Sequence, residues 1–233
     1  MAKRRIFRRG SHNWFLLVLA MALLGLLAAG LIGWLAPAED APESSAPTAP
    51  TQSKPPFIWQ SPAEKRIEKL KETPVPDWIS QEYIPTLVTA RSGETLEDLS
   101  GVVIHYVGNP GTTAAGNRNY FATPGTEVCS HFVVGLKGEI IQCLPLWERS
   151  VASNYRNRDT ISIEVCHPDA TGKFTQDTYA SLIRLTAWLC EIGELDVEEV
   201  IRHYDVTGKE CPRYYVEHEE AWQQLLADVT AAK

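Results

Sequence analysis

Two residues that commonly bind zinc stand eight positions apart near the end of the chain. They are His203 and Cys211, in the segment His-Tyr-Asp-Val-Thr-Gly-Lys-Glu-Cys-Pro. Neutral imidazole and thiolate are both frequent zinc ligands. Gly208 lies between them and allows the backbone to fold back, so that both side chains can reach one ion. The segment therefore predicts part of a zinc site whose remaining ligand comes from elsewhere in the sequence.

His105 is the leading candidate for that third ligand. It stands near the end of the run Val102–Tyr106, whose β-branched residues are typical of a buried strand. His203 is expected to end a short strand of its own, 200–203. Because functional sites of α/β sheets gather at strand ends, we expect the two histidines to meet. His131 is a less favoured ligand, and we expect it to form hydrogen bonds to nearby groups instead.

Glu164 lies in a segment, Thr160–Cys166, that alternates between apolar and polar residues. In a strand, Ile161, Ile163 and Val165 would share one face because successive side chains point to opposite sides. Glu164 is therefore not directed into the core that these residues enter.

The elements that must position these residues follow from periodicity and capping signals. Ser61, Pro62 and Glu64 predict a helix start, and Thr175 predicts another, with Gly193 as the C-terminal stop of that second helix. The sequence predicts strands at 102–106, 160–166 and 200–203, a hairpin of 130–135 with 139–144, and helices at 61–72, 175–193 and 216–229. Strands interleaved with helices predict an α/β fold with a mixed central β-sheet flanked by helices and the zinc site at the strand ends.

The N-terminal part of the chain predicts a membrane anchor. Residues 14–36 are apolar and uncharged, and about 22 residues at ~1.5 Å each span the ~30 Å hydrocarbon core. The basic tail 1–13 should stay in the cytoplasm, which places the catalytic domain outside the cell membrane on a single-pass helix. The alternative is a cleaved signal peptide, because Ala36-Pro37-Ala38 loosely resembles a cleavage site.

Composition and charge set further limits. With 233 residues and 44% hydrophobic residues, the chain can form one substantial core. We expect a Pro/Ala/Ser-rich linker at 37–56, a helical extension at 57–100 and the zinc domain at 101–233. The first ten residues contribute a charge of +5 to the net −7, so the remainder is strongly acidic and nucleic acid is excluded as a partner.

Five segments, taken together and in order, resemble one known family. They are Val102–His105, Ser130–Val134, Gly138–Gln142, Thr160–Glu164 and His203–Pro212. The chain from about 101 to 215 resembles the zinc-dependent N-acetylmuramoyl-L-alanine amidases, relatives of the amidase-type phage lysozymes and of peptidoglycan recognition proteins. The resemblance implies a bacterial peptidoglycan hydrolase that cuts the amide bond between N-acetylmuramic acid and L-alanine of the stem peptide.

The resemblance also implies roles for individual residues. The metal ligands of the family fall on His105, His203 and Cys211, the catalytic carboxylate on Glu164, and a catalytic lysine on Lys209. If the segment around Lys209 is extended, residues two apart point the same way, so that Lys209 faces the metal with Cys211. Three protein ligands would leave zinc an open position for a water whose pKa falls to about 7.

One position departs from part of the family. Some branches place a catalytic tyrosine just before the second histidine, and this chain has Ser130 there. Proton transfer then falls on Glu164, which would accept the water proton and return it to the leaving amine. Lys209 and zinc would share the negative charge on the carbonyl oxygen.

Two other functions remain open from the sequence. A non-catalytic peptidoglycan-binding module of the same fold would lack a metal ligand, and both Cys211 and Lys209 argue against it. A Cys-His thiol hydrolase would need a reactive cysteine beside a helix N-terminus or a basic group.

The remaining polar residues and cysteines carry weaker signals, and the oligomeric state is left open. Loops 154–158 and 117–119 are weak candidates for substrate contacts, and His167 and His218 are incidental. The cysteines other than Cys211 form either bridges or buried free thiols: Cys129, Cys143, Cys166 and Cys190.

Overall fold

A six-stranded mixed sheet forms the centre of the computed structural model, which describes residues 60–86 and 89–233. Its strands follow one another in space as β1-β4-β3-β5-β2-β6. Only the pair of β3 and β4 is antiparallel, and it forms the predicted hairpin. The strands are β1 (Ser80–Gln81), β2 (Val102–Tyr106), β3 (Phe132–Val134), β4 (Ile140–Gln142), β5 (Ile161–Val165) and β6 (Val200–Arg202).

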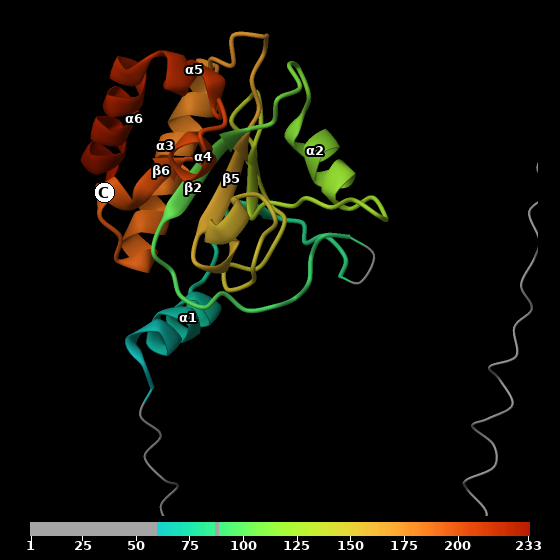
Figure 1. The fold of residues 1–233 in the computed structure, drawn as a ribbon, viewed down its shortest axis with the longest axis vertical. Helices are drawn as coiled ribbons and strands as arrows, with labels where there is room; N and C mark the ends of the chain where they lie inside the picture. Colours follow the sequence, from blue (N-terminus) through green and yellow to red (C-terminus); the bar gives the residue numbers. More distant parts are fainter. Residues whose placement is uncertain (1–59, 87–88) are drawn as a thin grey trace, which may run out of the picture. The chain divides into compact units, whose positions relative to one another are not determined.

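Helices cover both faces of this sheet. Figure 1 shows α3 and α6 side by side on one face, whereas α2 lies on the other. The helices are α1 (Pro62–Glu72), α2 (Ala114–Phe121), η1 (Asn154–Arg158), α3 (Gln176–Gly193), η2 (Val197–Glu199), α4 (His203–Thr207), α5 (Arg213–Glu217) and α6 (Glu219–Ala232). The predicted α/β fold, a mixed sheet flanked by helices, is therefore confirmed.

Strand alternation divides the interior into two hydrophobic clusters. Ile161, Ile163 and Val165 of β5 lie in the larger cluster, together with buried residues of α3 and α6. Val133 of β3 points the other way, into a smaller cluster that includes Phe121 of α2. The expected alternation of β5 is thus confirmed, and Glu164 belongs to neither cluster.

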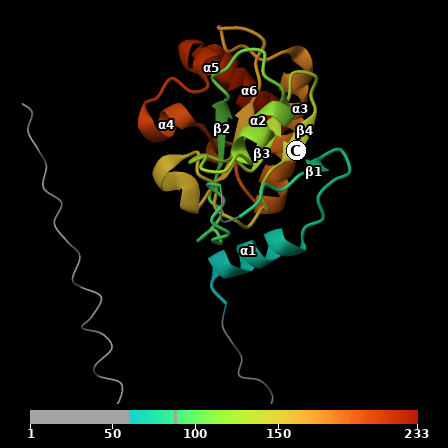
Figure 2. The ribbon, with the colours of Figure 1, turned by 90° about the vertical axis from the view of Figure 1, so that its right-hand side faces the viewer.

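The segment that precedes β2 contributes both a helix and a strand. Helix α1 begins at the predicted capping box, in which Ser61 Oγ accepts from the Glu64 N–H at 3.2 Å. Besides α1, the segment predicted as a helical extension at 57–100 contains β1, which adds a parallel edge strand to β4. The N–H groups of Glu82 and Ile84 also donate to carbonyls at the end of β4 and just after it. Figure 2 shows α1 apart from the sheet edge that β1 forms.

Two predicted helix boundaries differ from the structure. Gly193 is still helical, and the left-handed cap is Glu194 with φ 55°. Gly193 serves close packing instead, since a Cβ there would lie 2.8 Å from Leu99 Cδ2. The single helix predicted at 216–229 is split into α5 and α6, because His218 between them leaves the helical conformation with φ −126° and ψ 84°.

The five cysteines are buried free thiols, so the alternative of disulfide bridges is not adopted. Among residues 60–86 and 89–233, no helix combines the length and apolar character that a membrane crossing needs. The predicted tail 1–13, membrane helix 14–36 and linker 37–56 lie outside the described residues.

Candidate metal centre

The register of the sheet brings His105 and Glu164 together. They are paired positions on the adjacent parallel strands β2 and β5, so their side chains point to the same face of the sheet. Strand β6 pairs with the other edge of β2, with Arg202 opposite Ile104. His203 therefore follows directly beside the end of β2.

The sequence predicted that His203 ends a strand. In the structure, His203 begins helix α4 instead. The carboxylate of Asp205 accepts hydrogen bonds from the backbone N–H of Arg202 at 2.8 Å and from its guanidinium. This cap turns the chain out of β6 at Arg202. The histidine is consequently placed at the first helical position, where it remains buried.

The three predicted ligands meet at one point. Ligand atoms of His105, His203 and Cys211 all lie within 4.8 Å of one another. Cys211 Sγ lies 3.9 Å from His105 Nδ1, and the two imidazole centroids are 4.6 Å apart. Gly208, with φ 77°, ends α4 in the left-handed conformation that glycine favours, and its N–H donates to Tyr204 O at 2.7 Å. This turn returns the chain toward His203.

Both imidazoles are held at the ring nitrogen that faces away from this point. His105 Nε2 lies 3.0 Å from Ser153 Oγ, and His203 Nε2 lies 2.9 Å from Asn154 Oδ1. His203 Nδ1 is buried and has no hydrogen-bond partner. Because buried polar atoms are ordinarily paired, this nitrogen fits a metal ligand, and two imidazoles with one thiol match the donor preference of zinc.

The local electrostatics favour neutral imidazoles. Burial, together with the charges of His203 and Lys209, holds the pKa of His105 well below its usual value. Burial and Lys209 also lower the pKa of His203. Neutral imidazole is the form that binds metals, so both residues are ready to act as ligands near pH 7.

The thiol of Cys211 is protonated in the absence of a metal. Burial raises the pKa of Cys211 to about 12, and the Glu164 carboxylate acts in the same direction. Since zinc binds the thiolate, metal binding at this site would release a proton.

Glu164 and Lys209 line the same cavity as the three ligands. The Oε2 atom of Glu164 is buried without a hydrogen-bond partner, and burial raises the pKa of Glu164 to about 8, opposed by Lys209. Lys209 itself is exposed. We had expected the segment around Lys209 to be extended. Instead, the Cys211 N–H donates to the Lys209 carbonyl at 2.7 Å and closes a tight turn.

The cavity has a volume of about 410 Å³ and is lined by further residues besides the three ligands, Glu164 and Lys209. Its further lining is mostly apolar, with amide side chains beside the histidines. These residues are Phe121, Val128, Cys129, Val151, Ala152, Asn154 and Asn157. Asn154 and Asn157 belong to loop 154–158, which the sequence marked as a weak candidate for substrate contacts. No periodicity or motif marks the other five, because they come from loops and a helix end far apart in the sequence.

His131 lies outside the ligand group and forms the hydrogen bonds that we expected. Its Nδ1 accepts from the Ser162 N–H at 3.0 Å, and its Nε2 donates to Glu148 O at 2.8 Å. Ser130, at the tyrosine position of other branches, is buried and donates to Phe132 O. Neither side chain lines the cavity.

The arginines of the two loops that were weak substrate candidates have mainly structural contacts. Arg118 donates to the backbone carbonyls of Glu82 and Tyr83. Arg156 is paired with Asp159, while Arg158 is exposed. His167 stacks on Tyr106, and His218 lies 3.4 Å from Glu220.

The family model described as N-acetylmuramoyl-L-alanine amidase matches residues 95–214. Among curated relatives, N-acetylmuramoyl-L-alanine amidase BlyA of Bacillus subtilis (strain 168) is 29% identical over 170 residues, which cover 64% of this chain and 46% of BlyA. N-acetylmuramoyl-L-alanine amidase CwlL of Bacillus licheniformis is 30% identical over 54% of this chain and 39% of its own length. The chain thus spans less than half the length of these two relatives.

Solved structures agree with the sequence matches. A mutant endolysin from Bacillus subtilis superposes with a TM-score of 0.57 and 29% identity, covering 65% of this chain and 97% of the endolysin. The catalytic domain of XlyA gives the same TM-score and identity over 98% of its length. The family match includes all three meeting side chains, His105, His203 and Cys211, and both residues beside them. This chain therefore belongs to the N-acetylmuramoyl-L-alanine amidase family.

Proposed function

We propose that this protein is a zinc-dependent amidase that hydrolyses the bond between N-acetylmuramic acid and L-alanine in bacterial peptidoglycan. The observation that carries this proposal is the meeting of His105, His203 and Cys211 in a cavity that also contains Glu164 and Lys209. A ligand group with an adjacent carboxylate and ammonium provides the parts that metal-assisted amide hydrolysis needs.

Each residue has a distinct task in this proposal. His105, His203 and the Cys211 thiolate would hold the metal. Zinc, when bound, acts as a Lewis acid and lowers the pKa of a coordinated water to about 7. Glu164 accepts the proton of the attacking water and returns it to the leaving amine, a role that suits a carboxylate with a raised pKa.

Lys209 acts on the charge of the reacting carbonyl. Lys209 lines the cavity, and its ammonium group would offset the negative charge that develops on the scissile oxygen. The apolar walls at Phe121, Val128 and Val151 exclude part of the solvent, which strengthens this electrostatic interaction.

The two alternative functions fit the site less well. A nucleophilic thiol needs a lowered pKa, whereas burial raises the pKa of Cys129 to about 11 and that of Cys211 to about 12. A peptidoglycan-binding module without catalysis would not need three potential metal ligands. It would also not need the buried Glu164 Oε2 beside them, which has no hydrogen-bond partner.

The products of digestion test the reaction. The purified protein should release stem peptides whose new amino terminus is L-alanine from purified peptidoglycan, without new reducing sugar ends. Release of reducing ends, or cleavage inside the stem peptide, would assign a different bond. Binding to peptidoglycan without any release would favour the non-catalytic module.

We further propose that the protein is anchored in the cell membrane by residues 14–36 with the zinc domain outside, an assignment that rests on the sequence alone. The intact protein should fractionate with membranes, and external protease should reach the zinc domain. Recovery of a soluble mature form that begins near Glu39 would instead establish the cleaved signal peptide.

A further inference from the structure

One short turn holds both of the histidines in the ligand group. Ser153 and Asn154 are consecutive residues at the start of η1, and they contact His105 and His203 respectively. The two histidines come from different elements, the end of β2 and the start of α4. A single turn therefore contacts both rings, each at its Nε2 atom.

The contact to His203 determines which nitrogen faces the site. Asn154 Oδ1 is an acceptor, so Nε2 of His203 carries the proton and Nδ1 keeps its lone pair. That Nδ1 is the buried nitrogen without a partner. In His105, Nε2 contacts Ser153 Oγ and Nδ1 lies 3.9 Å from Cys211 Sγ. Both rings thus present the same atom, Nδ1, to the same point.

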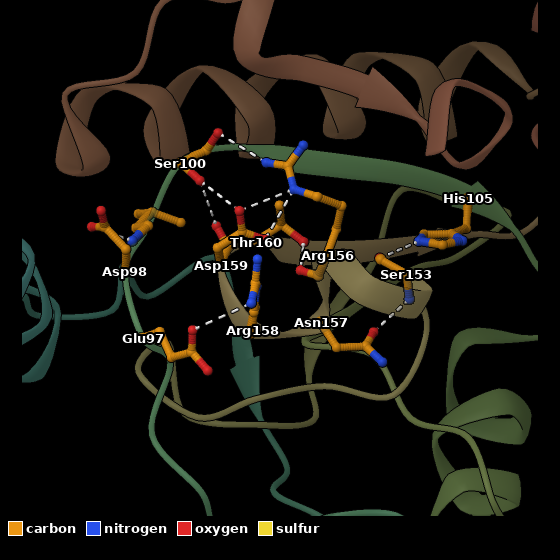
Figure 3. A network of polar contacts seen from close by, with 11 residues as sticks. Glu97, Asp98, Ser100, His105, Ser153, Arg156, Asn157, Arg158, Asp159 and Thr160 are labelled. Atoms are coloured by element: carbon orange, nitrogen blue, oxygen red, sulfur yellow. Dashed lines mark hydrogen bonds and ion pairs between the residues drawn. The ribbon is translucent and has the colours of Figure 1, made fainter. Parts of the chain in front are cut away.

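The backbone of the turn is adapted to this task. Asn154 has φ 56°, a left-handed conformation that costs a residue other than glycine roughly 1 kcal/mol or more and that asparagine tolerates comparatively well. Asn157 Oδ1 accepts hydrogen bonds from the N–H groups of Ala152 and Ser153, at 3.0 and 2.6 Å. The side chain of Asn157 therefore closes the turn beneath Ser153, as Figure 3 shows.

The other end of the turn is tied to the strand that carries His105. The Arg156 guanidinium pairs with Asp159 at 2.9 Å and donates to Ser100 O at 3.2 Å (Figure 3). The Ser100 N–H in turn donates to Asp159 O at 2.8 Å. Since Ser100 lies just before β2, these bonds connect the turn to that strand.

We infer that Ser153 and Asn154 are positioning residues, which hold Nε2 of His105 and His203 so that Nδ1 of each faces the metal. This inference rests on the proposed zinc site. Partners that orient metal-binding histidines typically contribute about 10–100-fold to metal affinity. Two such contacts on one rigid turn would make the site pre-formed before zinc arrives.

Removing each contact separately tests the inference. Asn154→Gly deletes the acceptor and keeps a backbone that tolerates positive φ, while Ser153→Ala deletes one oxygen from a buried side chain. Each change should weaken zinc binding by the full-length protein about 10–100-fold, measured by competition with a chelator. Asn154→Asp keeps an acceptor and should stay within a few fold. Arg158→Gln, at an exposed residue of the same turn, should leave zinc affinity unchanged.

A second readout separates positioning from a general structural role. In metal-free full-length protein labelled with ¹⁵N at its six histidines, His203 should show the Nε2–H tautomer. Asn154→Gly should give a mixture of His203 tautomers and leave the tautomer of His105 unchanged. Ser153→Ala should give a mixture of His105 tautomers and leave the tautomer of His203 unchanged. Thermal unfolding of the metal-free variants verifies that they remain folded.

Failure of this inference and failure of the proposed function would give different experimental results. If wild-type protein bound no zinc, the proposed function would fail, while the tautomers of the metal-free protein would still test the turn. Folded Asn154→Gly protein with wild-type zinc affinity and an unchanged His203 tautomer would overturn the inference.

Discussion

His105 of β2 and Glu164 of β5 occupy paired positions in neighbouring parallel strands, so one face of the sheet carries both a metal ligand and a carboxylate. Strand register, fixed by the core residues of the opposite face, therefore sets the relation between the proposed ligand and the proposed base. The packing of Ile161, Ile163 and Val165 into the larger hydrophobic cluster holds that register in place.

Glu164→Gln keeps the size of the side chain and removes the proton acceptor. Turnover should fall by about 10²–10⁴, the usual contribution of a positioned general base, while zinc content and muropeptide affinity stay unchanged. Product release and bound zinc are measured on the same preparations. Glu191→Gln, which removes an exposed charge on α3, serves as the control. Near-normal turnover of Glu164→Gln would place the base elsewhere, and His131, which does not line the cavity, would not replace it.

Lys209→Met keeps much of the stem and removes the ammonium group beside the cavity. Because the charge acts mainly in the transition state, turnover should decrease by about 10²–10³ with little change in substrate affinity. Steady-state kinetics on a soluble muropeptide separates the two effects. Lys65→Met on α1 removes an exposed charge far from the ligand group in sequence and should change neither turnover nor KM. A rise in KM alone would assign Lys209 to substrate binding.

Cys211→Ser tests the thiolate ligand. Serine is not deprotonated near pH 7, whereas zinc readily binds thiolate, so zinc affinity should fall sharply. Cys129→Ser is a matched control, because Cys129 lines the same cavity but is not one of the three meeting residues. Zinc per protein is measured after dialysis against a weak chelator. Full occupancy in Cys211→Ser would contradict the assignment.

The stability of the metal-free protein should depend on pH through His131. Burial lowers the pKa of His131 from its usual value of about 6.5 to about 4, so between these values the unfolded chain binds more protons than the folded one. The free energy of unfolding should therefore fall as the pH falls from about 6.5 to 4, with a contribution from this residue of up to about 3 kcal/mol.

His105 and His203 also have lowered pKa values and act in the same direction. The contribution of His131 is isolated by comparing the pH slope of wild-type protein with that of His131→Gln, both without zinc. The variant should show a shallower slope in urea unfolding between pH 4 and 6.5. Identical slopes would mean that His131 is protonated equally in both states.

Local signals explain which parts of the fold the sequence could predict. The capping box at Ser61 and the cap at Thr175 act within three residues, and both helices begin where expected. A run of β-branched residues located β2, and the alternation of apolar and polar residues located β5. Strand β1 has only two residues and depends on its pairing with β4, so no periodic pattern could reveal it.

The residues of the site also divide into those that the sequence could predict and those that it could not. Its three potential ligands were recognisable because their residue types and spacing are chemically distinctive. Ser153 and Asn154 contact His105 and His203 across 48 and 49 residues of sequence, and an isolated serine and asparagine in a loop give no signal of such contacts. The start of α4 at His203 was missed because a short strand and a helical turn meet at Arg202.

The most direct test of the account is the zinc dependence of the amidase reaction. Release of peptides with amino-terminal L-alanine from purified peptidoglycan should stop when a chelator removes one zinc per chain, and should return when zinc is restored. A thiol-alkylating reagent should have little effect while zinc shields Cys211. Turnover that survives complete removal of metal, or that is lost on alkylation of the zinc-loaded protein, would contradict the central claim.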